Sequence, residues 1–434
     1  MGCKAMNYFK QPACKSLGFS LIELMIGMTI SLIVIVGIIK IFDTSSSLNR
    51  TQMGLARIQE NGRFTLVNIK QNAEQIGYQY CLSSSYLSQN TKTGSPQRFW
   101  KVYSGGLAEL GFPSKSEAVM DEDNDGVADV ISSISDPYFI DPAYFLHGHE
   151  CNDTECSPNF NSVGTDKSFT LPEIGTNDGN RIADTDVLTM RYISGSGREV
   201  ETIQNLPNAE ITYTQNTIDT NFNIPVSGDT VLIASCNDMP VIVVDSINSS
   251  SEMITLDMPE LHRIQGGESA LTKVFSLAKD FKTITYYVEN DIVDGRDIPT
   301  LYSVINGVKN PLVQGVDRFD VIYGVQTSSS KIKYITADEV QNIPESDCIG
   351  LPYKDSTTGV RLLNTTGCAW RSIVSIEVHL LLNTISNSST KNNESFVYSI
   401  DGQTRQLPSD LKSGIEHYNM YRKEFATTIA LKNY

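Results

Sequence analysis

"GFSLIELMIGMTISLIVIVGIIKIF" runs from Gly18 to Phe42, and this apolar stretch decides how the chain is organised. The part from Leu24 to Phe42 is long enough to cross a bilayer as a helix, which takes about 20 residues. A secretory signal peptide fits less well, because its apolar core covers about 7–15 residues and ends in an A-x-A-like site, which does not follow here. A plain membrane anchor with an exported domain is therefore the simplest interpretation.

A plain anchor does not explain Glu23, which lies near the start of the apolar run. A carboxylate within such a span costs roughly 2.5–3.5 kcal/mol on insertion scales, and such residues usually mark a function and have a partner. A cut between Gly18 and Phe19 would give Phe19 a new α-ammonium group to serve as that partner. Residues 1–17 contain no acid and carry positive charge that keeps the N-terminus cytoplasmic, at Lys4, Lys10 and Lys15.

The stretch "KSLGFSLIELMIGMTIS" resembles the class III signal of type IV pilins and of type II secretion pseudopilins. The shared features are a basic leader, a glycine before the cut, a phenylalanine after it and a glutamate at the fifth mature position. The resemblance implies that a prepilin peptidase cleaves after Gly18 and that the amine of Phe19 is methylated. It also implies that Glu23 neutralises the Phe19 amine of a neighbouring subunit when helices pack in a filament. A buried carboxylate becomes tolerable when such a partner arrives.

The segment after Phe42 is polar but periodic. Apolar or small residues recur every three or four positions, which predicts one buried face of a helix. These residues are Leu55, Ile58, Gly62, Leu66, Ile69, Ala73 and Ile76. Joined to the membrane span, it gives a helix from about Ser20 to Ile76, roughly 85 Å long. Residues 43–47 and Gly54 are weak helix positions, where a kink or melted turn is plausible. An amphipathic helix lying on the membrane fits less well, because its polar face is not rich in Lys and Arg.

From about Cys81 the helical period gives way to short runs rich in Val, Ile, Thr and Tyr. These runs predict strands, at 186–193, 230–235, 240–247, 283–290, 318–325 and 372–383. In the last run, Val374, Ile376, Val378, Leu380 and Leu382 alternate with a mostly polar set, so we expect one buried face. We therefore predict an α+β fold, in which a long N-terminal helical spine packs on a mainly antiparallel β-sheet.

The body of the chain resembles the PilW minor pilins. The matching stretches are "TDVLTMRYI", "GDTVLIASC", "YYVEN", "LYSVINGVKNPLVQGVDRFDVIYGV" and "YRKEFATTIALKN". The resemblance implies the type IV pilin fold and these regions: a leader over 1–18, a helix over 19–76 (transmembrane over 19–42, amphipathic over 43–76) and a globular domain over 77–434. It fades over about 84–170, which we interpret as a loop-rich insertion. The pseudopilin GspJ is an alternative, but such proteins are typically shorter.

The chain has eight cysteines, two before the apolar run and six after it. An even six on the exported side fits disulfides in an oxidising compartment, although six cysteines allow 15 pairings. We expect Cys151–Cys156 and Cys348–Cys368, which close short loops, and Cys81–Cys236 from what remains.

Residues 121–130, "DEDNDGVADV", carry alternating carboxylates and a turn-making glycine. Calcium takes six to eight oxygens, and this spacing matches the first half of an EF-hand loop, with candidate ligands Asp121, Asp123, Asp125, Val127 (through its carbonyl) and Asp129. Ser132 stands where an EF-hand has its bidentate Glu, so a looser DxDxDGxxD loop fits better. The alternative is an acidic surface turn.

The stretch "HGHECNDTEC" follows in the same segment. His147, His149, Cys151 and Cys156 have residue types that bind zinc. In an oxidising compartment, a small disulfide loop is the favoured interpretation.

The sequence favours a structural protein over an enzyme. Its five histidines accompany no G-x-S-x-G, P-loop or H-E-x-x-H motif, and His379 sits on the polar face of a predicted strand. The net charge of −16 argues against nucleic acid as a partner. The resemblance implies a minor pilin that helps to start pilus assembly in or near the tip, first in the inner membrane and then in the pilus. Its partners would be other minor and major pilins, the prepilin peptidase and a tip adhesin. The alternatives are a type II secretion pseudopilin and a calcium-dependent adhesive tip module.

Overall fold

The computed structural model describes most of the chain after the first residues, with gaps in several loops. The described residues are 20–80, 82–83, 100–105, 107–112, 120–121, 137–140, 142–160, 169–204, 208–214, 224–235, 239–257, 272–327, 331–348, 353–354, 361–362, 367–385, 396–400, 403–407 and 420–432. The chain divides into two units, residues 1–53 and residues 54–434.

The long helix α1 spans Leu21–Ala73, close to the predicted bounds. Residues 43–54, where a melted turn was plausible, are helical. The hydroxyls of Thr44 and Thr51 donate to carbonyls one helical turn earlier, those of Lys40 and Ser47, so these side chains do not open the helix.

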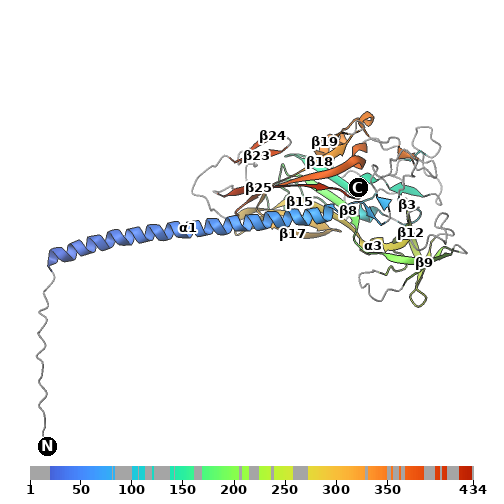
Figure 1. The fold of residues 1–434 in the computed structure, drawn as a ribbon, viewed down its shortest axis with the longest axis horizontal. Helices are drawn as coiled ribbons and strands as arrows, with labels where there is room; N and C mark the ends of the chain where they lie inside the picture. The colour runs from blue at the N-terminus through green and yellow to red at the C-terminus, as the bar shows by residue number, and fades with distance from the viewer. Residues whose placement is uncertain are drawn as a thin grey trace, which may run out of the picture. The chain divides into compact units, whose positions relative to one another are not determined.

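The second unit contains a six-stranded antiparallel sheet in the order β17-β16-β15-β8-β6-β7. Figure 1 labels three of its strands, β8, β15 and β17. Its strands are β6 (Leu146–Cys151), β7 (Cys156–Ser157), β8 (Val187–Ile193), β15 (Phe281–Val293), β16 (Arg296–Ile305) and β17 (Val308–Gln314). Asp294-Gly295 and Asn306-Gly307 connect β15, β16 and β17 with positive φ at all four residues, as two-residue hairpins require. Segment 84–170, interpreted as an insertion, contributes two strands, β6 and β7, to the central sheet.

A second antiparallel sheet has the order β19-β18-β22-β25. Its strands are β18 (Val316–Gln326), β19 (Ile332–Ile335), β22 (Ile373–Asn383) and β25 (Arg422–Ala430). The prediction that only one face of β22 is buried is wrong in part, because Ser375, His379 and Leu381 on the other face are also buried.

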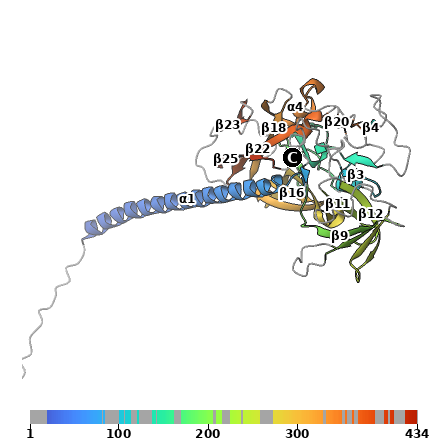
Figure 2. The same ribbon diagram turned by 45° about the vertical axis from the view of Figure 1, so that its right-hand side comes forward.

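A third group of strands closes into a barrel. The pairings run from β11 through β14, β9, β10, β13 and β12 and return to β11, all antiparallel. The strands are β9 (Arg198–Gln204), β10 (Glu210–Tyr213), β11 (Thr230–Ala234), β12 (Met239–Asn248), β13 (Met253–Leu256) and β14 (Lys273–Ser276). The side chains inside it form a separate hydrophobic cluster that includes Val200, Ile211, Ile233 and Ile254. In Figure 2, β9, β11 and β12 gather on the side of this unit away from β18 and β22.

The remaining elements are short. β3 (Trp100–Val102) pairs in parallel with β12 and antiparallel with β5 (Tyr138–Ile140). The others are β1 (Tyr78–Gln79), β2 (Leu82–Ser83), β4 (Met120–Asp121), β20 (Tyr353–Lys354), β21 (Arg361–Leu362), β23 (Phe396–Ile400), β24 (Gln403–Leu407), α3 (Leu277–Asp280), α4 (Ala337–Gln341), η1 (Ala108–Leu110), η2 (Pro142–Phe145), η4 (Glu345–Asp347) and η5 (Cys368–Ser372).

The main core joins the helix to both sheets. Ile58, Ile69 and Ala73 from α1 belong to the same buried cluster as residues of β8, β15, β18 and β22. The predicted apolar stripe of the helix is therefore the surface that the sheets cover, and the α+β expectation is confirmed.

Candidate assembly site

The N-terminal half of α1 is apolar and exposed. Large hydrophobic side chains from Leu21 to Phe42 are open to their surroundings, and none of the most apolar window is buried. The segment is long and apolar enough to cross a membrane, and it lies near the N-terminus.

Polar side chains in this segment are largely satisfied by the helix itself. The hydroxyl of Thr29 donates to the carbonyl of Ile26 at 2.8 Å, and that of Ser31 donates to Gly27 at 2.7 Å. Such bonds let hydroxyl groups enter a hydrocarbon environment without an unmet donor.

Glu23 differs from these residues because it carries a charge. Its carboxylate accepts a hydrogen bond from the backbone N–H of Ser20 at 3.3 Å, and within residues 20–53 it forms no ion pair. One weak hydrogen bond does not offset the cost of a carboxylate in lipid. Gly18 and Phe19, the predicted cleavage residues, lie outside the described part of the chain.

Close contact between α1 and the last strand depends on a glycine. A Cβ atom on Gly62 would lie 2.6 Å from two ring carbons of Phe425 in β25. That is well inside van der Waals contact, so glycine at this position allows the C-terminal strand to lie against the helix.

Two asparagines of α1 form a polar cluster with the central sheet. Asn72 donates to the Tyr286 hydroxyl at 2.6 Å and accepts from the Tyr192 hydroxyl at 2.8 Å, while Tyr286 donates to Asn68 at 3.1 Å. Burial raises the pKa of Tyr192 to about 12 and raises the pKa of Tyr286 further, so both donate as neutral phenols. The periodic pattern of the helix does not predict this cluster, because Asn68 and Asn72 fall between its apolar positions.

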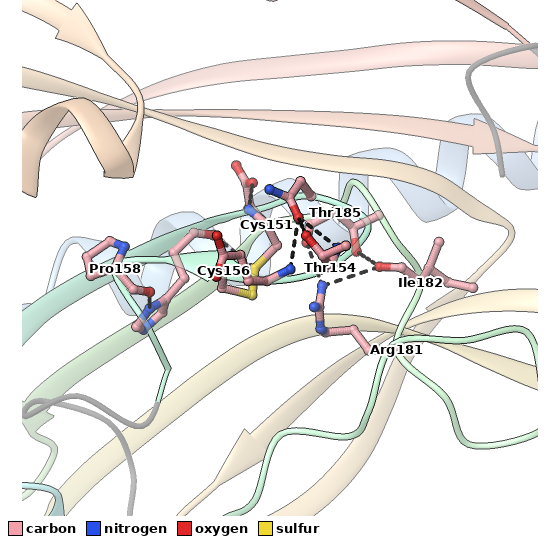
Figure 3. Close-up of a disulfide and its surroundings, with 11 residues drawn as sticks. Cys151, Thr154, Cys156, Pro158, Arg181, Ile182 and Thr185 are labelled. Carbon is pink, nitrogen blue, oxygen red and sulfur yellow. Dashed lines mark hydrogen bonds between the residues drawn. A yellow bond between two sulfur atoms is a disulfide. The ribbon is translucent and has the colours of Figure 1, made fainter.

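Two of the three predicted disulfides are confirmed, Cys151–Cys156 and Cys348–Cys368. The first joins β6 to β7 at the edge of the central sheet (Figure 3). The second brings η5 close to η4. Cys81 and Cys236 lie outside the described residues, so their pairing stays a prediction.

The stretch holding the first disulfide is tied to its surroundings by buried polar groups. Asp186 accepts from the backbone N–H of Val321 in β18 at 2.8 Å and from that of Cys151 at 3.4 Å. Burial, followed by the nearby acids Glu150 and Asp320, raises the pKa of Asp186 well above its usual value. Figure 3 also shows Arg181 beside the carbonyls of Ile182 and Thr185, to which its guanidinium donates.

The two histidines before the disulfide are buried and neutral. His147 stacks on Trp370, with ring centroids 4.6 Å apart, and His149 lies 2.6 Å from the carbonyl oxygen of Pro158 through Nδ1. Burial lowers the pKa of His147 well below 6.5 and that of His149 to about 4. Because Cys151 and Cys156 are consumed by the disulfide, the zinc alternative for this stretch is wrong.

His379 is also buried, although it lies on the predicted polar face of its strand. Its two ring nitrogens lie 3.0 Å from a carboxylate oxygen of Glu377 and 3.1 Å from one of Glu424. This bridge ties β22 to β25.

The predicted calcium ligands cannot be placed as a set. Asp121 ends β4, whose backbone pairs with Arg361 of β21, and Asp123, Asp125, Val127 and Asp129 lie outside the described residues. Within the residues that the structure describes, no three His, Cys, Asp or Glu side chains form a group that could hold a metal ion.

Comparison with known protein families gives two matches. Residues 285–433 match the family model of PilW, type IV pilus-assembly protein W. Residues 14–39 match the prokaryotic N-terminal methylation motif. No curated protein and no solved structure matches the chain significantly.

Proposed function

We propose that the chain is a PilW-type minor pilin of a type IV pilus that helps to initiate pilus assembly in or near the tip complex, and the two family matches support this proposal. The observation that carries the proposal is Glu23, a carboxylate in an exposed apolar helix that is long enough to cross a membrane and whose first part lies within the methylation-motif match at residues 14–39.

Cleavage at Gly18/Phe19 would create a positively charged partner for the Glu23 carboxylate. The bond between the two residues is hydrolysed, and the amine of Phe19 becomes the N-terminus of the mature helix. At neutral pH this amine is positive, and on a neighbouring pilin it would pair with Glu23 within the membrane. The pair offsets part of the desolvation of each group, which a single subunit does not achieve.

The exposed helix surface supports contact with other helices. A Cβ atom on Gly27 would meet nothing within 4 Å, and Ser31 lies one turn later. Small residues at this spacing let helix backbones approach closely in lipid, where van der Waals packing drives association. Before assembly we place the helix in the inner membrane with its N-terminus in the cytoplasm and the second unit in the periplasm.

Within the pilus, the second unit would contact other minor pilins, major pilins and a tip adhesin. Its role is structural, as is typical of pilin families. Calcium binding by residues 121–129 stays a proposal from the sequence alone. A rise in melting temperature with added CaCl₂, lost in Asp123→Asn/Asp125→Asn, would support it, and no rise in the unchanged protein would contradict it.

The test of the assembly proposal is the substitution Glu23→Gln, which removes the charge but keeps the size of the side chain. Glu74→Gln is the matched control, because Glu74 follows the same helix but pairs with exposed Lys432 at 3.4 Å. We expect Glu23→Gln to reach the membrane in normal amounts yet to be lost from sheared pili, and Glu74→Gln to be incorporated normally. Normal incorporation of Glu23→Gln would contradict the proposal.

A further inference from the structure

The barrel is inserted into what would otherwise be a simple hairpin of the central sheet. Ile193, the last residue of β8, pairs with Phe281, the first residue of β15. The backbone N–H of Ser194 donates to the carbonyl of Asp280 at 2.7 Å. The two ends of the barrel segment therefore meet where a short turn would close β8 onto β15.

One wall of the barrel is fixed in the main core. Leu232, Ala234, Met239, Val241 and Phe275 lie on β11, β12 and β14 and belong to the core cluster that also contains the α1 stripe. The opposite side chains of the same strands, such as Val231 and Ile242, fill the barrel. Apolar contacts therefore attach this wall of the barrel to the main core.

The other wall, formed by β9, β10, β13 and the second half of β12, faces outward and is polar. Cross-strand register places Gln204, Glu210, Thr255 and Ser246 in one row. Thr202, Thr212, Met253 and Asn248 form the next row. We call this surface the outer wall.

The outer wall and its connections carry an excess of negative charge. Glu199, Glu201, Asp245 and Asp257 are exposed, and Glu210 and Glu252 are partly exposed. The basic residues in the described parts of 198–276 are Arg198 and Lys273. The ammonium group of Lys273 is already engaged, since it donates to the Ser196 carbonyl at 3.0 Å and lies 5.0 Å from the Tyr80 ring centroid.

Neither family match includes the barrel, because the matches end at residue 39 and resume at residue 285. The outer wall is therefore not a surface that these family models describe. An exposed, four-stranded face with an excess of negative charge fits a protein surface of the opposite sign, because such complementarity steers encounter and selects partners.

We propose that the outer wall is the docking surface for a Lys- and Arg-rich face of another subunit of the same pilus. This rests on the proposed function, since it requires the chain to be in the pilus. Contacts between exposed charges are screened by salt, with a Debye length of about 3 Å at 1 M, so the docking weakens as ionic strength rises.

The experiment is zero-length carbodiimide cross-linking of intact sheared pili, which joins a carboxylate to an amine in contact with it, followed by peptide mass spectrometry. The Glu74–Lys432 pair, 3.4 Å apart within the chain, is the internal positive control. We expect links from Glu199, Glu201 or Glu210 to lysines of another subunit, reduced several-fold in 0.5 M NaCl.

A Glu74–Lys432 link without any link from the outer wall to another subunit would overturn this proposal while leaving the proposed function intact. Absence of the chain from sheared pili would overturn both. As a second measurement, the number of cross-links from Glu210 to the other subunit should fall several-fold in the variant Glu199→Lys/Glu201→Lys. The matched control Glu155→Lys/Glu173→Lys, which reverses two exposed charges outside the barrel, should keep the links from Glu210. Equal linking in the two variants would contradict the docking surface.

Discussion

Replacing Ile69 with alanine tests whether α1 is part of the core of the second unit. Ile69 is fully buried, whereas Val67, two residues earlier on the same helix, is 46% exposed. Ile→Ala removes about three methyl or methylene groups at about 0.8 kcal/mol each, and the cavity left behind adds to the loss. We expect Ile69→Ala to lower the free energy of unfolding by about 3 kcal/mol.

Val67→Ala is the matched control. Its side chain is largely solvated and alanine is the better helix former, so we expect a change within about 0.5 kcal/mol of zero. Urea unfolding of the full chain in mild detergent, followed by tryptophan fluorescence, measures both variants. Trp100 and Trp370 are both 1% exposed in the main core and report its opening. Equal midpoints for the two variants would refute the claim that the sheets cover the predicted stripe.

Three further predictions concern the buried polar groups and the disulfides. The pKa of His149 in the folded protein, about 4, lies below its usual 6.5, so the stability that neutral His149 contributes is lost as the pH falls from 6.5 to 4. We therefore compare the unfolding free energies of the unchanged protein and His149→Gln by urea titration. We expect the difference between them to shrink by about 3 kcal/mol over that pH range. Removing the Cys348–Cys368 disulfide with Cys348→Ser/Cys368→Ser should lower the unfolding free energy by about 3 kcal/mol, and removing Cys151–Cys156 should lower it by about 2 kcal/mol. The first loss is larger because that disulfide closes a loop of 20 residues and the second a loop of 5. The opposite order in the same assay would contradict the loop-entropy account. Asn72→Leu leaves the Tyr192 hydroxyl without its acceptor and should destabilise the protein by about 1–3 kcal/mol. Gln71→Leu, on the exposed side of the helix, is the control and should not destabilise it. A difference between the two variants of under about 0.5 kcal/mol in calorimetry or urea unfolding would show that the polar cluster adds no stability.

Local sequence patterns predicted much of the fold. The stripe through Ile58, Gly62 and Ile69 placed the helix face correctly, because a period near 3.6 is read directly from the chain. The strands predicted at 186–193, 283–290 and 318–325 correspond to β8, β15 and β18. The two short-loop disulfides were also predictable, because closing a short loop needs no knowledge of the fold.

The closed barrel was not predictable in this way. Its closure depends on β11 pairing with both β12 and β14, and on β14 pairing with β9, which are contacts between distant segments. An alternating pattern such as that of β9 is compatible with a barrel, a sandwich or a flat sheet. The burial of His379 was missed for a related reason: alternation predicts two faces of a strand, but not that a second layer or a pair of carboxylates covers the polar one.

The most direct test of the assembly account is mass spectrometry of the N-terminal peptide of this chain recovered from sheared pili. The account predicts a mature N-terminus at Phe19 carrying one methyl group, found together with other pilin subunits. Recovery of the chain only from membranes, with Lys4, Lys10 and Lys15 still attached and no pilin alongside it, would contradict it.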